Sequence, residues 1–288
     1  MRVLVTGGSG RLGSYVTREL IAHGHAVVNV DQRPCPAGSA PAPGSDYQYR
    51  ETDLDDVSQV AGALAGREAV IHLGAIPRAY GHAEEVFFSR NTQATFAVLQ
   101  AASLLHVRTA VIASSLATLG IAYGPQPTPP RYVPVDDGHP LLCADPYGLG
   151  KEIDERTGEM FHRQSGMTVL ALRFHWIALP EEAVTAAERT TTDPARGTNV
   201  LWGYIDIRDA ATVCRLGAEA RGLGFEAFVI AAGDMLSTTP TAELLARYAP
   251  GVERRVAIPG TASAFSAAKA QRLLGFTPNH SWRTPGAE

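Results

Sequence analysis

Four glycines stand within eight residues, TGGSGRLG (6–13), immediately after a short apolar run, RVLV (2–5). A buried strand, a glycine-rich turn and a helix in this order open a parallel α/β sheet. Gly7, Gly10 and Gly13 let the backbone turn tightly, approach a ligand closely and pack the helix on the sheet. Because free N–H groups at a helix start attract anions, the stretch predicts a phosphate site, although a turn that only caps the helix has the same pattern.

A carboxylate further along the chain favours the phosphate site over the simple turn. Asp31 ends the second predicted strand, eighteen residues after Gly13, where a carboxylate can accept hydrogen bonds from an adenosine ribose. The same carboxylate repels a 2′-phosphate, so the pattern predicts NAD as the cofactor. Arg33 and Arg11 lie close enough in sequence to keep NADP as the alternative.

The end of the third predicted strand has two interpretations. Asp53 and Leu54 stand where they can meet the adenine of a dinucleotide. Asp53 can equally be the N-cap of a helix over 55–65. The two roles are compatible, and both remain open.

The first half of the chain alternates buried strands with helical patterns. The strands are predicted at 2–5, 26–30, 69–73 and 109–114, with helices at 11–23 and 84–105. The strands are apolar throughout rather than at every second residue, which indicates that helices cover both faces of the sheet. We therefore predict an α/β fold with a Rossmann-like, doubly wound parallel sheet.

The rhythm loosens from about residue 176. Strand patterns recur at 225–231 and 254–259, and a short helix ending at a glycine is expected at 266–275. Two proline-rich stretches, 33–45 and 123–134, are predicted to be loops. We predict a dinucleotide-binding domain over 1–175 and a small substrate-binding lobe over 176–288 that is intertwined with the end of the sheet.

Composition excludes several kinds of partner. The formal net charge is -4 and no cluster of Lys and Arg stands out, which argues against nucleic acid and anionic membranes. The three cysteines, Cys35, Cys143 and Cys214, have no metal-like spacing, so we expect neither a disulfide framework nor a metal site. No stretch is apolar over the roughly 18 residues that a membrane helix needs, so a cytoplasmic location is expected.

A tyrosine and a lysine stand one helical turn apart in DPYGLGKE (145–152). Asp145 is the expected N-cap and Pro146 the first residue of this helix, so Tyr147 and Lys151 lie on one face. An ammonium beside a phenol stabilises the phenolate, which makes the phenol a usable proton carrier. By itself the pair is more typical of a solvated helix surface, so its meaning depends on its neighbours.

Those neighbours are two serines at the end of the strand before the helix, in IASSLATLG (112–120). Ser114 and Ser115 stand at the carboxyl edge of the predicted sheet, where open α/β sheets bind ligands. A hydroxyl there could hold a substrate oxygen beside the tyrosine. The serines could equally cap the loop that follows.

Together these motifs resemble the short-chain dehydrogenase/reductase superfamily, in its extended branch of NAD-dependent epimerases and dehydratases. The matching stretches cover about residues 1–175: TGGSGRLG (6–13), Asp31, DL (53–54), HLGA (72–75), Asn91, SSLATLG (114–120), YGLGK (147–151) and LR (172–173). The resemblance implies that Ser115, with Ser114 as the fallback, Tyr147 and Lys151 form the catalytic triad. It also implies that the cofactor lies against Gly7, Gly10, Arg11, Leu12, Gly13, Asp31, Arg33, Asp53, Leu54, Leu73, Gly74, Ala75, Asn91, Tyr147 and Lys151.

The chain departs from the nucleotide-sugar epimerases of that branch. After LR those enzymes carry an asparagine that touches the sugar nucleotide, whereas this chain has His175 and Trp176. Where they carry an arginine that grips the diphosphate, this chain has Trp202, followed by Gly203. A second family arginine has no counterpart in IPGTASAFSAAKA (258–270), although arginines at 208, 254 and 255 could substitute.

The substrate is therefore expected to be a sugar or sugar acid. Arg78 and His82, in the loop 74–82, are candidate substrate-binding residues together with Ser115, His175 and Trp176. Local similarity to uronate dehydrogenases points the same way.

The leading hypothesis is an NAD(P)-dependent oxidoreductase that transfers hydride at a secondary alcohol or ketone carbon. The alternatives are a nucleotide-sugar 4-epimerase, which oxidises and re-reduces its substrate, and a non-catalytic NAD(P)-sensing module. By analogy with the family, a homodimer is expected through the helix after residue 84 and the helix of Tyr147. Apolar residues such as Phe87, Phe96 and Val98 could supply that face or could serve the sheet instead.

Overall fold

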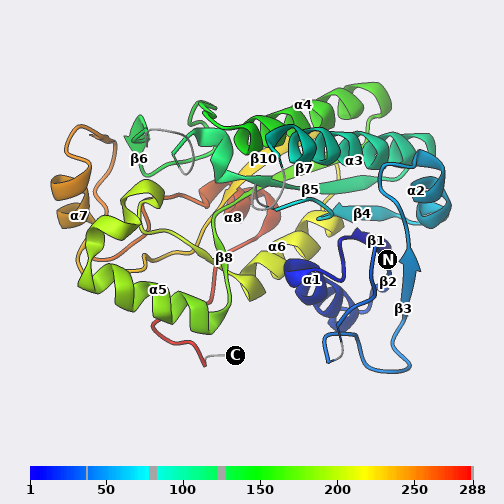
Figure 1. Cartoon of the computed structure of the whole chain (residues 1–288), viewed down its shortest axis with the longest axis horizontal. Coiled ribbons are helices and arrows are strands. Elements are labelled where there is room, and N and C mark those ends of the chain that lie inside the picture. The colour runs from blue at the N-terminus through cyan, green and yellow to red at the C-terminus, as the bar shows by residue number, and fades with distance from the viewer. Residues whose placement is uncertain (37, 78–82, 122–127, 287–288) are drawn as a thin grey trace. The chain divides into compact units, whose positions relative to one another are not determined.

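The computed structural model describes residues 1–36, 38–77, 83–121 and 128–286. Its main feature is a seven-stranded sheet in the order β10-β7-β5-β4-β1-β2-β3 (Figure 1). The strands are β1 (Arg2–Thr6), β2 (Ala26–Asp31), β3 (Tyr47–Glu51), β4 (Ala69–His72), β5 (Thr109–Ser115), β7 (Thr168–Phe174) and β10 (Phe225–Ile230). The predicted Rossmann-like α/β fold is confirmed.

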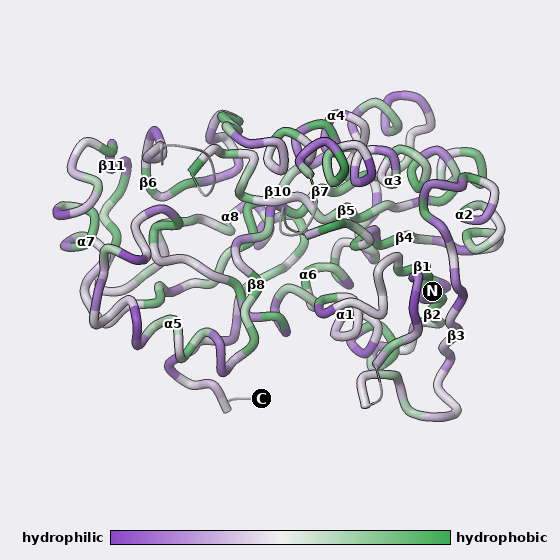
Figure 2. Tube along the Cα trace, viewed as in Figure 1, coloured by the Kyte–Doolittle hydropathy of each residue, from purple (hydrophilic) through white to green (hydrophobic). Residues whose placement is uncertain are grey.

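The sheet is parallel from β3 to β5, with β1 at its centre. Val3 is in register with Val27 of β2 on one side and with Ala69 of β4 on the other. The strands β4 and β5 are green, and so hydrophobic, in Figure 2. All four residues of β4 are buried, as expected for a strand that is covered on both faces.

Eight helices accompany the strands in the described residues. They are α1 (Arg11–Ala22), α2 (Val57–Leu64), α3 (Glu84–Leu104), α4 (Pro146–Ser165), α5 (Pro180–Thr192), α6 (Ile207–Glu219), α7 (Thr241–Tyr248) and α8 (Ala268–Leu274). Two 3-10 turns, η1 (Leu116–Leu119) and η2 (Pro194–Val200), and two small sheets, β6 (Tyr132–Val133) with β11 (Glu253–Arg254) and β8 (Ile177–Ala178) with β9 (Ile205–Asp206), complete the fold.

The chain divides into two compact units, each assembled from three stretches. The first unit is Met1–Ser114, Leu149–Leu172 and Ala211–Ala227; the second is Ser115–Gly148, Arg173–Ala210 and Phe228–Glu288. The predicted division into 1–175 and 176–288 stays a prediction about which part binds cofactor and which binds substrate.

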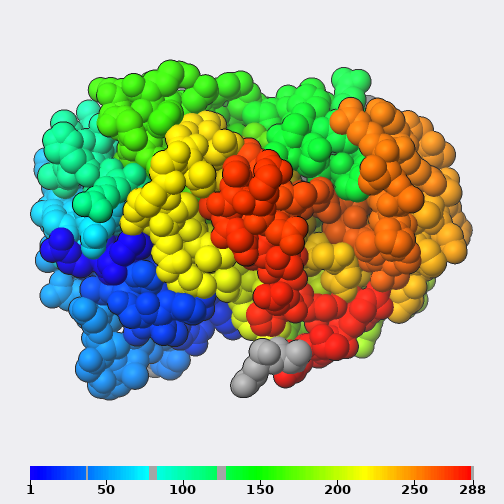
Figure 3. Space-filling model, turned by 180° about the vertical axis from the view of Figure 1, so that it is seen from behind, coloured from blue at the N-terminus to red at the C-terminus, as the bar shows by residue number. Residues whose placement is uncertain are grey.

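Helices cover both faces of the sheet in the first unit. On one face α3 and α4 lie together, with the rings of Phe96 and Phe161 in contact at 5.4 Å between centroids (Figure 1). On the other face α1 and α6 are side by side, joined by a salt bridge from Arg215 to Glu19 at 2.9 Å; α6 is the yellow helix beside the blue N-terminal segment in Figure 3. Phe87, Val98 and Leu99 of α3 are buried in this unit, so they serve the sheet.

The second unit has a core of its own around η2, α7 and the segment before α8. Trp202, Leu201, Met235, Leu245 and Phe265 are among its buried members. The strand predicted over 254–259 is wrong, because only Glu253–Arg254 pairs, with Tyr132–Val133 of β6. The helix predicted over 266–275 is α8, which ends at Gly275 with a φ of +67°.

The structure bears on membrane-spanning helices and on the cysteines. Of the helices in the described ranges, none is both long enough and apolar enough to span a bilayer. In the described residues Cys35, Cys143 and Cys214 form no disulfide, and no group of three or more metal-binding side chains occurs there.

Candidate active site

The glycine-rich turn has no room for side chains. A Cβ at Gly7, which has a φ of +67°, would lie 2.8 Å from the backbone nitrogen of Gly74. A Cβ at Gly13 would lie 2.1 Å from the Gly7 carbonyl oxygen, far inside van der Waals contact. The turn therefore packs against the segment that follows β4 and against itself, as a phosphate-binding turn must.

The start of α1 lies beside this turn. Its N-cap is Gly10, which is exposed and contributes no side-chain hydrogen bond to the helix. Such an uncapped helix start, with its partial positive charge, suits an anion. The residues present therefore fit a dinucleotide pyrophosphate.

Asp31 ends β2 next to the turn and is half-buried. Its Oδ2 accepts a hydrogen bond from the Ser9 backbone N–H at 3.1 Å, and its Oδ1 accepts one from Gln32 at 2.8 Å. Each carboxylate oxygen has a second lone pair. The carboxylate is thus held in place by the turn and retains the capacity to accept ribose hydroxyls, while Arg33 is exposed.

The start of α2 settles one of the open alternatives. The N-cap of α2 is Asp56, whose side chain accepts hydrogen bonds from Ser58 and Gln59. The N-cap role considered for Asp53 is therefore wrong. Asp53 is exposed, and its side chain accepts a hydrogen bond from the Asp55 backbone at 3.1 Å, whereas Leu54 packs on Gly74.

The loop after β4 is fastened from two sides. The Thr6 hydroxyl accepts hydrogen bonds from the backbone of Leu73 and Gly74 at 3.2 and 3.0 Å. Buried Asn91 of α3 binds both the N–H and the carbonyl of Ile76, at 2.8 and 3.0 Å. Asn91 thus orients this loop. Arg78 and His82, the candidate substrate residues of the loop, lie outside the described residues.

Lys151 is buried in the first unit, at the end of β5. Its Nζ donates a hydrogen bond to the Ala113 carbonyl at 2.8 Å and lies 3.2 Å from Oδ2 of Asp154. The side chains of Lys151 and Asp154 are 6% and 2% exposed, so this is a buried ion pair. Lys151 is therefore presented at the carboxyl edge of the sheet that also carries the glycine turn.

The two serines at the end of β5 point to different partners. The Ser114 hydroxyl donates a hydrogen bond to Oε1 of Glu155 at 2.6 Å in the interior. Ser115 is half-buried, and its hydroxyl oxygen accepts a hydrogen bond from the Ala117 backbone at 3.1 Å. Ser115 is thus also the N-cap of η1. Since Ser114 is engaged in the core, Ser115 is the better candidate for a substrate-facing hydroxyl.

The start of α4 agrees with the sequence. Pro146 is its first residue, and Asp145 accepts a hydrogen bond from the Gly148 backbone at 2.9 Å. Tyr147 is half-buried in the first turn of this helix. Ser115 and Tyr147 belong to the second unit and Lys151 to the first, so the joint geometry of the three stays a prediction.

His175 and Trp176 follow β7 in the second unit. His175 is buried, with Nε2 3.0 Å from the Val200 carbonyl and Nδ1 accepting from the Trp176 backbone at 2.6 Å. Burial lowers the pKa of His175 to about 4, so the ring is neutral. Both ring nitrogens are engaged within the chain, whereas the Trp176 side chain is 43% exposed and available for contact.

The position at which nucleotide-sugar epimerases are expected to carry a diphosphate-binding arginine is taken by Trp202 here, and Gly203 follows it. Trp202 is fully buried, its Nε1 donates to the Pro194 carbonyl at 2.7 Å, and its ring lies 5.8 Å from that of Tyr248. A Cβ at Gly203 would lie 2.6 Å from Nε2 of His175. Both positions are buried, and neither carries a cationic side chain. Arg208 is paired with Asp206 through bonds of 2.9 and 3.0 Å.

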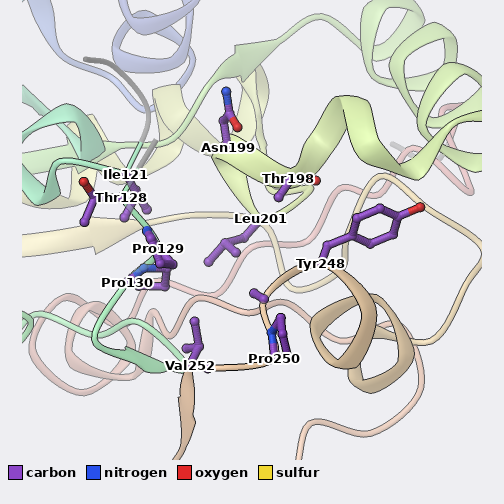
Figure 4. A pocket seen from close by; sticks show the side chains of 12 residues that line it. Ile121, Thr128, Pro129, Pro130, Thr198, Asn199, Leu201, Tyr248, Pro250 and Val252 are labelled. Atoms are coloured by element: carbon purple, nitrogen blue, oxygen red, sulfur yellow. The ribbon is translucent and has the colours of Figure 1, made fainter. Parts of the chain in front are cut away.

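A pocket of about 310 Å³ opens in the second unit close to Trp202 (Figure 4). Its lining is mostly apolar, with Thr128, Thr198 and Asn199 as the polar members. The other lining residues are Ile121, Pro129, Pro130, Leu201, Tyr248, Ala249, Pro250, Gly251 and Val252. No charged side chain is among these residues, so the pocket suits an uncharged group.

Comparison with known proteins shows the family of this chain. The sequence model of the NAD dependent epimerase/dehydratase family matches residues 3–231. The chain belongs to this family. A UDP-glucose 4-epimerase of Corynebacterium glutamicum is 26% identical over 97% of the chain and 92% of that enzyme. The chain spans about half the length of several other curated epimerases that it matches.

Solved structures agree with this membership. A short-chain dehydrogenase/reductase superfamily protein of Agrobacterium tumefaciens, with bound NAD, has a TM-score of 0.74 at 22% identity, covering 99% of this chain and 94% of that one. A mutated uronate dehydrogenase has a TM-score of 0.67 at 19% identity, covering 98% and 82%. At these identities the likeness establishes the shared fold.

The structure adds residues to the family motif that the sequence did not single out. Asp154 and Glu155 stand in the charged stretch KEIDER (151–156), to which the sequence motifs assigned no role, and both are buried. The i to i+3 spacing from Lys151 was the one available signal for Asp154. His72 of β4 and Thr95 of α3 also lie in this buried group, with 3.2 Å between His72 Nε2 and the Thr95 hydroxyl. No local sequence pattern predicts a contact between these two elements.

Proposed function

We propose that this family member is an NAD(P)-dependent oxidoreductase. It would transfer a hydride at a secondary alcohol or ketone carbon of a sugar or sugar-acid substrate. The observation that carries the proposal is the buried Lys151 ammonium, held by the Ala113 carbonyl at the sheet edge that bears the glycine turn. A buried cation at this edge has a functional explanation and little structural one.

NAD is the proposed cofactor, and when bound it supplies the acceptor or donor of the hydride. The turn of Gly7, Gly10 and Gly13 with the uncapped start of α1 would hold the pyrophosphate, and Asp31 the adenosine ribose. Leu54, Leu73, Gly74 and Ala75 would line its remaining length, with Asn91 orienting that loop. Arg11 and Arg33, both exposed, keep NADP as the alternative.

The chain's own residues would do the proton chemistry. Tyr147 would take the proton of the substrate hydroxyl during oxidation and return it during reduction. The Ser115 hydroxyl would hold that oxygen in place, and the Lys151 ammonium would bind the nicotinamide ribose and stabilise the phenolate. This triad is our proposal from the family motif and from the position of Lys151.

The proposed substrate is a sugar without a nucleotide diphosphate. A diphosphate needs cationic or hydrogen-bonding partners to offset its desolvation, and the corresponding position is occupied by the buried ring of Trp202. Trp176, with its exposed side chain, is the proposed stacking surface for the sugar ring, with Arg78 and His82 as proposed partners of its polar groups. His175 would act by orienting the turn of Trp176.

A nucleotide-sugar 4-epimerase remains the second candidate. The near full-length match to the Corynebacterium glutamicum UDP-glucose 4-epimerase favours it. The two candidates make opposite predictions for the redox state of the cofactor, because an epimerase returns the hydride to its substrate.

The deciding experiment follows NADH absorbance while the protein and NAD are mixed with free uronic acids, free aldoses or UDP-sugars. Steady NADH accumulation with a free sugar acid supports the dehydrogenase, and UDP-sugar interconversion without NADH supports the epimerase. Tyr147→Phe should lower turnover by about 10²–10⁴-fold while NAD still binds. Absence of any dinucleotide binding would sink both candidates.

We further propose a cytoplasmic homodimer. Phe96 of α3 and Leu149 of α4 are 40% and 44% exposed in the first unit, and a partner copy would cover them. Light scattering coupled to size exclusion tests this, because Phe96→Glu should yield a monomer where the native protein is a dimer.

A further inference from the structure

Lys151 is paired with a carboxylate that lies outside the stretch YGLGK (147–151). Asp154 lies one turn further along α4, with its side chain 2% exposed and its Oδ2 3.2 Å from the Lys151 Nζ. Its other oxygen, Oδ1, is buried and has no hydrogen-bond partner among the residues that the structure describes. Burial is costly for a carboxylate that only fills space, and the Lys151 ammonium and the Thr95 hydroxyl offset part of that cost here.

The surroundings of the pair include further polar groups in the first unit. Thr95 of α3 faces the Asp154 carboxyl, and its hydroxyl lies 3.2 Å from Nε2 of His72 on β4. His72 Nδ1 is 2.7 Å from the Thr6 hydroxyl, which accepts from the backbone of Gly74. The neighbourhood of Lys151 is therefore connected to the proposed cofactor turn through buried hydrogen bonds.

The titratable groups near Lys151 lie on two elements, α4 and β4. Asp154 and Glu155 are on α4 itself, and Glu155 is bound to the Ser114 hydroxyl. His72 approaches from β4 and is neutral, because burial and then the Lys151 ammonium lower its pKa to about 3. Burial raises the pKa of the Asp154 carboxyl above its ordinary value, while the Lys151 ammonium and the Thr95 hydroxyl act in the opposite direction.

Lysine is rare in this protein. Of its 25 basic residues only Lys151 and Lys269 are lysines, and the others are arginines. An ammonium differs from a guanidinium in that it can lose its proton when buried. A lysine at this position therefore needs a device that keeps it charged, and a buried carboxylate is such a device.

We propose that Asp154 is the positioning residue of Lys151, holding its ammonium charged and fixed at the end of β5. A purely structural role predicts that an apolar side chain would serve as well, since buried ion pairs are often replaced without loss of stability. The counter-ion role predicts instead that the protonation of Lys151 depends on Asp154. Its use in catalysis rests on the proposed function, in which Lys151 binds the nicotinamide ribose.

Because the chain has two lysines, the ionisation of Lys151 can be followed directly. Protein labelled with [ε-¹³C]lysine gives one signal for each, and Lys269→Arg identifies the signal of Lys151. Both are titrated by NMR from about pH 6 to pH 11 in the absence of cofactor and substrate. The Lys151 midpoint of the native protein is the reference against which each variant is compared.

In Asp154→Asn, which keeps the shape and removes the charge, the Lys151 midpoint should fall by about 2 pH units, as expected for a buried amine that has lost its counter-ion. In Asp154→Glu, which keeps the charge, the Lys151 midpoint should return most of the way to its native value. Glu159→Gln, which removes a surface carboxylate paired with Arg163 on the same helix, is the matched control and should leave the midpoint unchanged.

A second readout connects the pair to the cofactor. NAD affinity, measured by calorimetry at several pH values, should fall in Asp154→Asn as the pH rises through the new Lys151 midpoint. In a Lys151→Met background Asp154→Asn should add no pH dependence, because its effect acts through the lysine.

The outcomes separate the two proposals. An unchanged Lys151 midpoint in folded Asp154→Asn overturns the counter-ion role, whatever the protein catalyses. A shifted midpoint with NAD affinity that does not respond to Lys151→Met supports the counter-ion role and contradicts the proposed function of Lys151. If Asp154→Asn does not fold, Asp154→Glu decides: a midpoint moved by more than about one unit despite the retained charge overturns the inference.

Discussion

The glycine turn of the first unit and the Trp202 segment of the second are both tightly packed around glycine, with opposite results. A Cβ at Gly13 would lie 2.1 Å from the Gly7 carbonyl, and a Cβ at Gly197 would lie 2.1 Å from Cδ1 of Trp202. In the first unit the tight turn brings the Ser9 backbone N–H to the Asp31 carboxylate. In the second unit Gly197 makes room for an indole ring that closes the position to ligands.

The contrast shows that tight glycine packing is not by itself a mark of a binding site. What distinguishes the first unit is that its polar groups stay accessible: Gly10 is exposed and Asp31 is half-buried. Trp202 instead has its one polar atom bonded to Pro194.

The largest effect should come from emptying the second-unit core. Trp202→Ala removes a fully buried ring and should lower the free energy of unfolding by about 3–5 kcal/mol. Trp176→Ala, at a side chain that is 43% exposed, should change it by less than about 0.5 kcal/mol. Urea unfolding monitored by circular dichroism measures both, and equal losses would contradict the assigned roles.

The first unit should respond in binding. Gly13→Ala forces the turn apart at a cost of about 1–3 kcal/mol, which corresponds to about a tenfold to 100-fold rise in the Kd for NAD. Gly62→Ala is the matched control, since its Cβ would have nothing within 4 Å on α2. It should leave the Kd unchanged and stabilise the helix by about 0.5–1 kcal/mol. Calorimetric titration with NAD makes the comparison.

Each unit also contains a buried neutral histidine, His72 in the first and His175 in the second, which sharpens the comparison by pH. The pKa of His72 is lowered to about 3 by burial and by the Lys151 ammonium, and that of His175 to about 4 by burial. Each unfolded histidine has its ordinary pKa of about 6.5, so unfolding takes up a proton between those values. The stability from each neutral ring is complete above about pH 6.5 and is lost as the pH falls toward about 4.

Below about pH 6 each ring should lower the free energy of unfolding by about 1.4 kcal/mol per pH unit. His72→Gln and His175→Gln should each reduce that slope, whereas His23→Gln, at an exposed position, should not. Urea midpoints at pH 7, 6 and 5 provide the test. A slope that is the same in all three variants and in the native protein would show that other groups govern the acid sensitivity.

The smallest effect concerns cofactor preference. Asp31→Asn removes the charge that repels a 2′-phosphate while it keeps an acceptor for the Ser9 N–H. The ratio of NADP to NAD affinity should rise by about tenfold, or about 1.4 kcal/mol. Arg33→Ala in the same background should reduce that gain. An unchanged ratio would mean that Asp31 does not face the ribose.

The fold and the proposed cofactor edge were within reach of the sequence because their signals are local. The apolar strand runs, the glycine turn and Pro146 at the start of α4 each act through neighbouring residues. The cap role considered for Asp53 failed because Asp56, three residues further on, has the same side chain and stands at the actual start of the helix. The strand expected over 254–259 failed because pairing needs a partner, and β6 offers only two residues.

The sequence alone predicts a parallel sheet, a glycine turn, an acidic residue at a strand end, and Tyr147 and Lys151 one turn apart on one helix. Only the tertiary structure decided that Asp154 and Glu155 are buried, that Ser114 faces inward, and that the Trp202 ring is part of the core of the second unit. The physical reason is that helix periodicity and turn geometry arise between near neighbours. Burial of a charge depends on which distant strand and helix cover it. The residues of KEIDER (151–156) alone therefore cannot predict that Asp154 and Glu155 are buried.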